Sequence, residues 1–257
     1  MTGTEALKVL ADVTATQWGM VTTAQAASLG VSRLSLSRLT EVGHLERLVH
    51  GVYRDMGAPA DEFEALRAAW LSTQPEDIAE ARLTDPLAGV VVMGASAAHL
   101  HHIGDLPADR HEFSTSRRRQ SQRPDIRYRI RTLPRQDITL AHGLPVTTKE
   151  RTLADLVETR TDLGLVAAAL GDALRSGSLD LARLELLLAP FAARNGFRAD
   201  DGNALLDRLV EMSGALRELS RAIERLTSKT KPSLASVAAI GPDLLALEAL
   251  ARGGSRD

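Results

Sequence analysis

Residues 22–54 read TTAQAASLGVSRLSLSRLTEVGHLERLVHGVYR and predict a short helix, a tight turn, a second helix and a small β-ribbon. Thr22, followed three residues later by Gln25, forms a capping box, which satisfies free backbone donors where a helix starts. Gly30 is suited to end this first helix, and Ser32 is suited to cap the second. Two helices joined by a short turn that contains glycine are typical of a helix-turn-helix.

The second helix of this stretch predicts a surface that reads DNA. At about 100° per residue, Leu36 and Leu39 share one apolar face. In a helix-turn-helix, the start of this helix meets base edges in the major groove, where arginine suits guanine and leucine can touch a thymine methyl. The residues that we expect to contact DNA are Ser32, Arg33, Leu34, Ser37 and Arg38. The alternative for Leu34 is a buried contact with a tail of the chain.

A hairpin is predicted after Gly43, because residues 45–49 and 52–54 form two short runs around the turn His50-Gly51. In a winged helix, such a hairpin is the wing. We expect His50 and Arg54 to reach backbone phosphates from it. The alternative is a small α/β module that packs against something other than DNA.

Two regions of the sequence carry a family resemblance. The first comprises WGMVTTAQA (18–26), LGVS (29–32), GHLERL (43–48) and GVYR (51–54), and the second is GLPVTTKERTLADL (143–156). They resemble the AbiEi-family antitoxins, the antitoxin half of bacterial toxin–antitoxin pairs whose toxin is a nucleotidyltransferase. The string SAAHLHHIG (96–104) is similar to a further element of this family in a looser form. The resemblance covers most of residues 7–160.

The resemblance implies a DNA-binding transcriptional repressor that autoregulates its operon and acts as the antitoxin of a nucleotidyltransferase toxin. The implied partners are double-stranded promoter DNA and a cognate toxin. One alternative is a stand-alone winged-helix regulator without a toxin. Another is an enzyme that acts on nucleic acid or phosphorylates a partner protein, with residues 117–135 holding phosphate.

Composition sets limits on the class of protein. The 257 residues include no cysteine, which excludes disulfides and thiolate metal sites and fits a reducing cytosol. The first residues have no basic segment before an apolar run, and no run approaches the roughly 20 apolar residues that span a bilayer. We therefore expect a cytoplasmic protein without a membrane partner.

Charge is segregated along the chain, although the net charge is only −2. Residues 117–135 hold eight arginines and one acid, Asp125, so this window carries +7 and the rest of the chain −9. The strand predicted at 126–132 alternates, with Ile126, Tyr128 and Ile130 facing inward. Arginine presents a fork of donors that suits phosphate. The expected phosphate or partner contacts are Arg117, Arg118, Arg119, Arg127, Arg129 and Arg131.

This arginine tract has three interpretations: a second contact with the DNA backbone, an interface with an acidic or RNA-bearing partner, or a solvated face paired with the acidic segment at 61–85. That segment holds seven acids and two basic residues, Arg67 and Arg82.

We expect neither a catalytic site nor a metal or cofactor site. His99, His101 and His102 lie close together, but no carboxylate completes a metal-binding set beside them. No Gly-rich phosphate loop and no Gly-x-Ser-x-Gly elbow is present. Arg151 and Asp155 stand four residues apart on a predicted helix, and we expect them to pair with each other.

The sequence as a whole predicts an α+β fold. A winged helix-turn-helix at 1–57, with a first helix at 4–15, is followed by a mixed α/β domain at 58–160 and a helical region at 161–257. The middle domain is expected to contain helices at 61–73 and 96–103, a strand at 89–93 and a capping box formed by Thr147 and Glu150. The expected C-terminal helices are 162–175, 178–188, 202–227 and 234–251.

Overall fold

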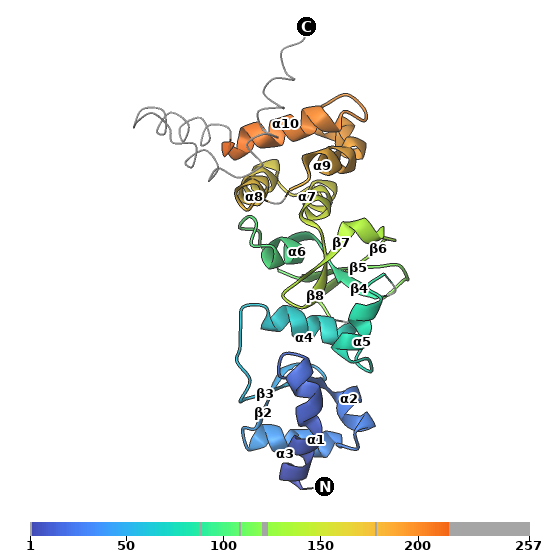
Figure 1. Cartoon of the computed structure of the whole chain (residues 1–257), viewed down its shortest axis with the longest axis vertical. Helices are drawn as coiled ribbons and strands as arrows, with labels where there is room; N and C mark the ends of the chain where they lie inside the picture. Colours follow the sequence, from blue (N-terminus) through green and yellow to red (C-terminus); the bar gives the residue numbers. More distant parts are fainter. Residues whose placement is uncertain (1, 88, 108, 120–122, 178, 216–257) are drawn as a thin grey trace, which may run out of the picture. The chain divides into compact units, whose positions relative to one another are not determined.

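The computed structural model describes residues 2–87, 89–107, 109–119, 123–177 and 179–215, and its elements are labelled in Figure 1. The chain divides into two compact units. Met1–Val92 and Asp109–Val146 form the first, and Met93–Ala108 and Thr147–Asp257 form the second. The predicted α+β class is confirmed, because a small antiparallel sheet with helices is followed by a mixed five-stranded sheet and then by helices.

The first unit begins with a winged helix. Its elements are α1 (Gly3–Thr16), β1 (Met20–Thr22), α2 (Thr23–Ser28), α3 (Arg33–Glu41), β2 (Leu45–Val49) and β3 (Val52–Asp55). The three strands form an antiparallel sheet in the order β1-β3-β2. Leu10, Val21, Leu36 and Leu39 are buried in one core, so the predicted apolar face of the second helix is confirmed.

The two predicted caps stand at the starts of α2 and α3. The Thr22 hydroxyl accepts from Gln25 N at 3.0 Å, and Gln25 Oε1 accepts from Thr22 N at 2.9 Å, which completes the capping box. The Ser32 hydroxyl accepts from Ser35 N at 3.1 Å and begins α3. Both predictions are confirmed.

The rest of the first unit is a five-stranded sheet with two helices. Its elements are α4 (Glu64–Thr73), α5 (Ala79–Thr84), β4 (Val90–Val92), β5 (His111–Thr115), β6 (Ile126–Ile130), the 3₁₀ turn η1 (Arg135–Asp137), β7 (Ile138–Ala141) and β8 (Leu144–Thr147). The strand order is β6-β5-β4-β8-β7. The central strand β4 runs antiparallel to β5 and parallel to β8, and all three of its residues are buried.

Three sequence predictions in this region need correction. The helix predicted from residue 61 begins at Glu64, because the Asp61 carboxylate accepts from Phe63 N at 2.9 Å and forms a turn first. The strand predicted to reach residue 132 ends at Ile130. Ile130 was expected inward but is 64% exposed, because β6 is an edge strand that pairs only with β5.

The second unit is helical. Its elements are α6 (Gly94–Leu100), α7 (Lys149–Glu158), α8 (Leu163–Arg175), α9 (Leu181–Leu188), the 3₁₀ turns η2 (Ala189–Phe191) and η3 (Ala193–Asn195), and α10 (Gly202–Ser213). In Figure 1, α10 packs on α8 and α9. Leu153, Leu170, Leu184, Leu205 and Leu209 are buried in their common core.

The cap of helix α7 lies one residue later than predicted. The Thr148 hydroxyl, not that of Thr147, accepts from the N3 backbone amide. Thr147 still belongs to β8, and its hydroxyl pairs with that of Thr152 at 2.7 Å. Glu150 instead accepts from Asp180 N at 2.8 Å, so the predicted capping box is wrong.

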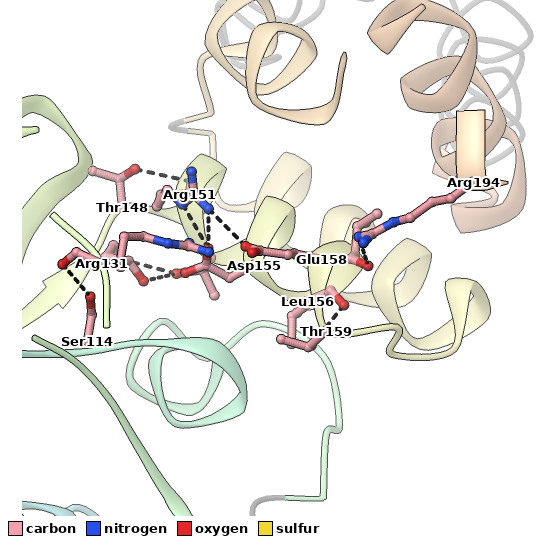
Figure 2. A network of polar contacts seen from close by, with 12 residues as sticks. Ser114, Arg131, Thr148, Arg151, Asp155, Leu156, Glu158, Thr159 and Arg194 are labelled. Carbon is pink, nitrogen blue, oxygen red and sulfur yellow. Dashed lines mark hydrogen bonds and ion pairs between the residues drawn. The ribbon is translucent and has the colours of Figure 1, made fainter. Parts of the chain in front are cut away.

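The predicted pair on α7 is confirmed. Arg151 Nε donates to Asp155 Oδ1 at 2.8 Å, and Arg151 Nη2 also reaches Glu158 at 3.4 Å (Figure 2). The Asp155 side chain is fully buried. Because a buried carboxylate requires a partner, this arginine has a structural role.

Two more predicted helices have different bounds. The helix predicted at 96–103 ends at Leu100, since His102 has a left-handed φ of 52°. Helix α10 ends at Ser213, because Gly214 takes a φ of 72° and closes it, and residues 216–227 of the helix predicted at 202–227 lie outside the described residues. The helix predicted at 234–251 lies outside the described residues.

Candidate nucleic-acid interface

Helix α3 presents a row of polar and apolar side chains to solvent. Arg33, Leu34, Ser37 and Arg38 are all exposed, because Leu36 and Leu39 occupy the buried face of the same nine-residue helix. Leu34 is 60% exposed, and residues 216–257, which include the C-terminal tail, lie outside the described residues. The first turns of α3 therefore offer two guanidiniums, a hydroxyl and a branched apolar group, the groups that distinguish base pairs in the major groove.

Ser32, the remaining predicted DNA contact at this helix, is exposed and also has a structural role. Its hydroxyl caps α3 and lies 3.0 Å from the Ser35 hydroxyl. Ser37 donates to the Glu41 carboxylate at 3.2 Å within the same exposed face. Both hydroxyls are thus held in place before any ligand arrives.

The wing is the hairpin of β2 and β3, and its tip is tied to α2. Gly51 turns the chain with a φ of 76°, and its carbonyl accepts from Thr23 N at 2.8 Å. A register shift between Arg47 and Val49 bends β2 before the turn. Exposed His50 stands at the tip. The wing is therefore held against the start of the helix-turn-helix.

Arg54, the other residue of the hairpin predicted to contact phosphate, is engaged in ion pairs and is not available to phosphate. Its side chain is only 11% exposed and forms ion pairs with Glu46 at 2.7 Å and with Glu64 at 2.6 Å. A guanidinium engaged with two carboxylates holds the wing to α4. We therefore correct the prediction and leave Arg54 out of the contact set.

A groove of about 490 Å³ lies between the wing, the start of α3 and the end of α4. Its lining includes Arg33, Arg47 and His50, together with Thr23 and Tyr53. Arg47 and Tyr53 are not among the contacts predicted from the sequence. The sequence feature that could have identified them is their position on the two strands of the predicted hairpin, close to the His-Gly turn.

Part of the arginine tract caps the C-terminal end of α4. Arg119 donates to the Thr73 carbonyl at 2.6 Å, and Arg123 donates to the Ser72 hydroxyl at 2.9 Å. Arg82 donates to the Trp70 carbonyl at 2.9 Å and lies over the Trp70 ring. Positive charge at this end complements the helix dipole. Burial lowers the pKa of Arg82 to about 9.

The rest of the tract is divided between paired and exposed side chains. Arg127 pairs with Glu112 at 3.3 Å on the neighbouring strand β5. Arg129 and Arg131, which are also predicted contacts, are half-buried. Arg117 and Arg118 are exposed in the loop after β5.

A buried network joins α2 to the segment that follows α4. Gln17 Nε2 donates to Gln25 Oε1 at 2.6 Å, and Gln25 Nε2 donates to the Asp77 carbonyl at 2.9 Å. The Thr22 hydroxyl donates to the Pro75 carbonyl. These bonds place the end of α4 as one wall of the groove.

The histidines near α6 have no shared ligand geometry. His101 Nε2 lies 2.7 Å from the Thr147 carbonyl, while His99 and His102 are exposed. Among the described residues, no group of three or more histidine, aspartate or glutamate side chains is placed to hold a metal ion. Within the same residues, no helix has the length and apolar character needed to cross a membrane.

Comparison with known proteins gives two family matches. A family model described as "Transcriptional regulator, AbiEi antitoxin" matches residues 8–54, and one described as "AbiEi antitoxin C-terminal domain" matches residues 88–201. The two matches together span more than half of the chain. Among solved structures, the RV2827C protein from Mycobacterium tuberculosis is similar, with 20% identity, a TM-score of 0.48, and coverage of 82% of this chain and 78% of that one. No curated protein matches.

Proposed function

The chain belongs to the AbiEi antitoxin family of transcriptional regulators, which is a non-enzymatic family, and from this premise we propose that it represses its own operon by binding double-stranded promoter DNA. Residues 1–57 are proposed as the DNA-binding domain. Helix α3 enters the major groove, and the wing contacts the backbone.

The exposed row on α3 carries this proposal. Arg33, Leu34, Ser37 and Arg38 face solvent from a helix whose other face is fixed in a core. Nothing in the packing of the winged helix requires these four side chains. Their types match the donors, acceptors and apolar contacts that read base edges.

We also propose that the chain acts as the antitoxin of a nucleotidyltransferase toxin encoded beside it. Family membership supports this, and the neighbouring reading frame provides the first check. We expect the neighbouring protein to arrest growth when it is produced alone and the arrest to be relieved when both are produced. A neighbour without such an effect would favour a stand-alone regulator.

The DNA-binding proposal is tested with the duplex upstream of the protein's own gene, across a series of salt concentrations. Arg33→Ala/Arg38→Ala is expected to lower operator affinity about 100-fold, since each base contact contributes about 1–3 kcal/mol. Arg175→Ala/Arg208→Ala removes the same charge from exposed positions in the helical unit and serves as control. Equal loss in both variants, or no wild-type binding at low salt, would overturn the proposal.

A further inference from the structure

The groove beside the wing points to a specific ligand. We propose that it binds a phosphodiester of the DNA backbone, with Arg47 and His50 as its main donors and Arg33 shared between this phosphate and the bases. The proposal rests on the proposed DNA-binding function and deepens it, because it adds Arg47 to the predicted contacts and joins it with Arg33 and His50 in one phosphate site.

The charge of the groove selects an anion. Its lining includes two guanidiniums, Arg33 and Arg47, together with the His50 imidazole. Among the residues that line this groove, none carries a carboxylate. Thr23 and Tyr53 also line the groove, and the Thr23 hydroxyl donates to the Gly51 carbonyl at 3.4 Å. A volume of about 490 Å³ leaves room for a phosphate with its flanking sugars.

The contact between Arg47 and His50 sets the direction of the imidazole. Arg47 Nη2 lies 2.8 Å from His50 Nδ1. A guanidinium only donates hydrogen bonds, so Nδ1 must accept here and Nε2 must carry the hydrogen. His50 therefore offers its Nε2–H as a donor from the exposed tip of the wing, while Arg47 keeps further N–H groups for the phosphate.

The walls of the groove place such a phosphate next to the bases. Thr23 comes from the start of α2, Arg33 from the first turn of α3, Arg47 and His50 from the wing, and Ser72 from the end of α4. These walls are joined by the Thr23–Gly51 bond and by the network from Gln25 to Asp77. A phosphate held there fixes the register of α3 without reading sequence itself.

The test uses the full chain with Arg47→Gln and, as a matched control, Arg208→Gln, an exposed arginine on α10. A contact with one phosphate contributes about 0.9 to the slope of log K against log salt. We expect Arg47→Gln to lower the slope by about that amount and to weaken binding equally on operator and scrambled duplexes. Arg208→Gln should leave both unchanged. Melting curves identical to that of the wild type are the check that the exposed substitutions leave the fold intact.

Duplexes with one neutral methylphosphonate, moved base by base along the site, locate the contact. At one position the neutral linkage should weaken wild-type binding and have no further effect on Arg47→Gln. If the wild type binds operator and Arg47→Gln keeps the full salt slope, this inference is wrong and the proposed function still stands. Loss of inorganic phosphate binding in Arg47→Gln, with an unchanged DNA slope, would assign the groove to a free anion instead. Absence of wild-type DNA binding removes both proposals.

Discussion

Arg47 and Arg54 are the same residue type in the same hairpin, and their surroundings give them different tasks. Arg54 lies opposite Glu46 in the β2–β3 register and also meets Glu64 of α4. Arg47 is exposed and touches the His50 ring. The partner on α4 is distant in sequence, so no spacing rule within the hairpin separates a structural arginine from one free to bind phosphate.

Replacing Arg54 should therefore weaken the fold and leave DNA contacts unchanged. Arg54→Met removes the partner of the partly buried Glu64 carboxylate, and we expect a loss of about 2 kcal/mol in the free energy of unfolding, the scale of a charged hydrogen bond. Urea denaturation measures this loss. Arg38→Met, at an exposed position on α3, should unfold like the wild type. A stable Arg54→Met protein with a reduced salt slope on DNA would restore Arg54 to the phosphate contacts.

Local signals predicted three features of the helix-turn-helix correctly. Thr22 with Gln25, Ser32, and the Leu36–Leu39 face each depend on residues within one or two helical turns, and the structure confirms each of them. The capping box at Thr147 failed because the strand β8 extends through that residue. The candidate groove could not be predicted, because its walls come from residues 23 to 75 and meet only after α2 is tied to the segment behind α4.

At the scale of elements, the helical unit depends on one close approach between helices. Gly202, the first residue of α10, lies where an added Cβ would stand 2.1 Å from the Glu185 carbonyl oxygen of α9 and 2.9 Å from Ala189 N. Both atoms belong to the backbone, so no side-chain rotation can relieve the clash. The two helices can pack at this distance only because a glycine starts α10.

Gly202→Ala is consequently expected to destabilise the helical unit by about 2–3 kcal/mol, the usual cost of overpacking. Denaturant unfolding followed by circular dichroism provides the measurement. Asn203→Ala, one residue further along the same helix and exposed, is the control and should be close to neutral, since alanine favours helix. Equal stability of the two variants would mean that α10 shifts freely against α9 and that the contact is not restrictive.

At the scale of the whole molecule, the arginines of the tract divide into two groups, one bonded at the end of α4 and one exposed. Within the first unit, Arg119 and Arg123 are bonded to Thr73 and Ser72 at the end of α4. Ser72 also lines the groove beside the wing. Arg119 and Arg123 are therefore held next to the proposed backbone site, and Arg117 and Arg118 of the same tract are exposed.

The exposure of Arg117 and Arg118 predicts an effect that depends on the length of the DNA. On a long duplex that contains the operator, Arg117→Ala/Arg118→Ala should reduce the slope of log K against log salt by about 2, because two phosphate contacts are lost. On a duplex trimmed to the base pairs that α3 and the wing cover, the same variant should bind like the wild type.

Arg175→Ala/Arg208→Ala controls for net charge on both duplexes. An equal loss on both lengths would mean a general charge effect, and no loss on the long duplex would assign the exposed pair to a partner other than DNA. The dependence on length thus separates a backbone contact at a defined place from simple attraction between a cationic loop and a polyanion.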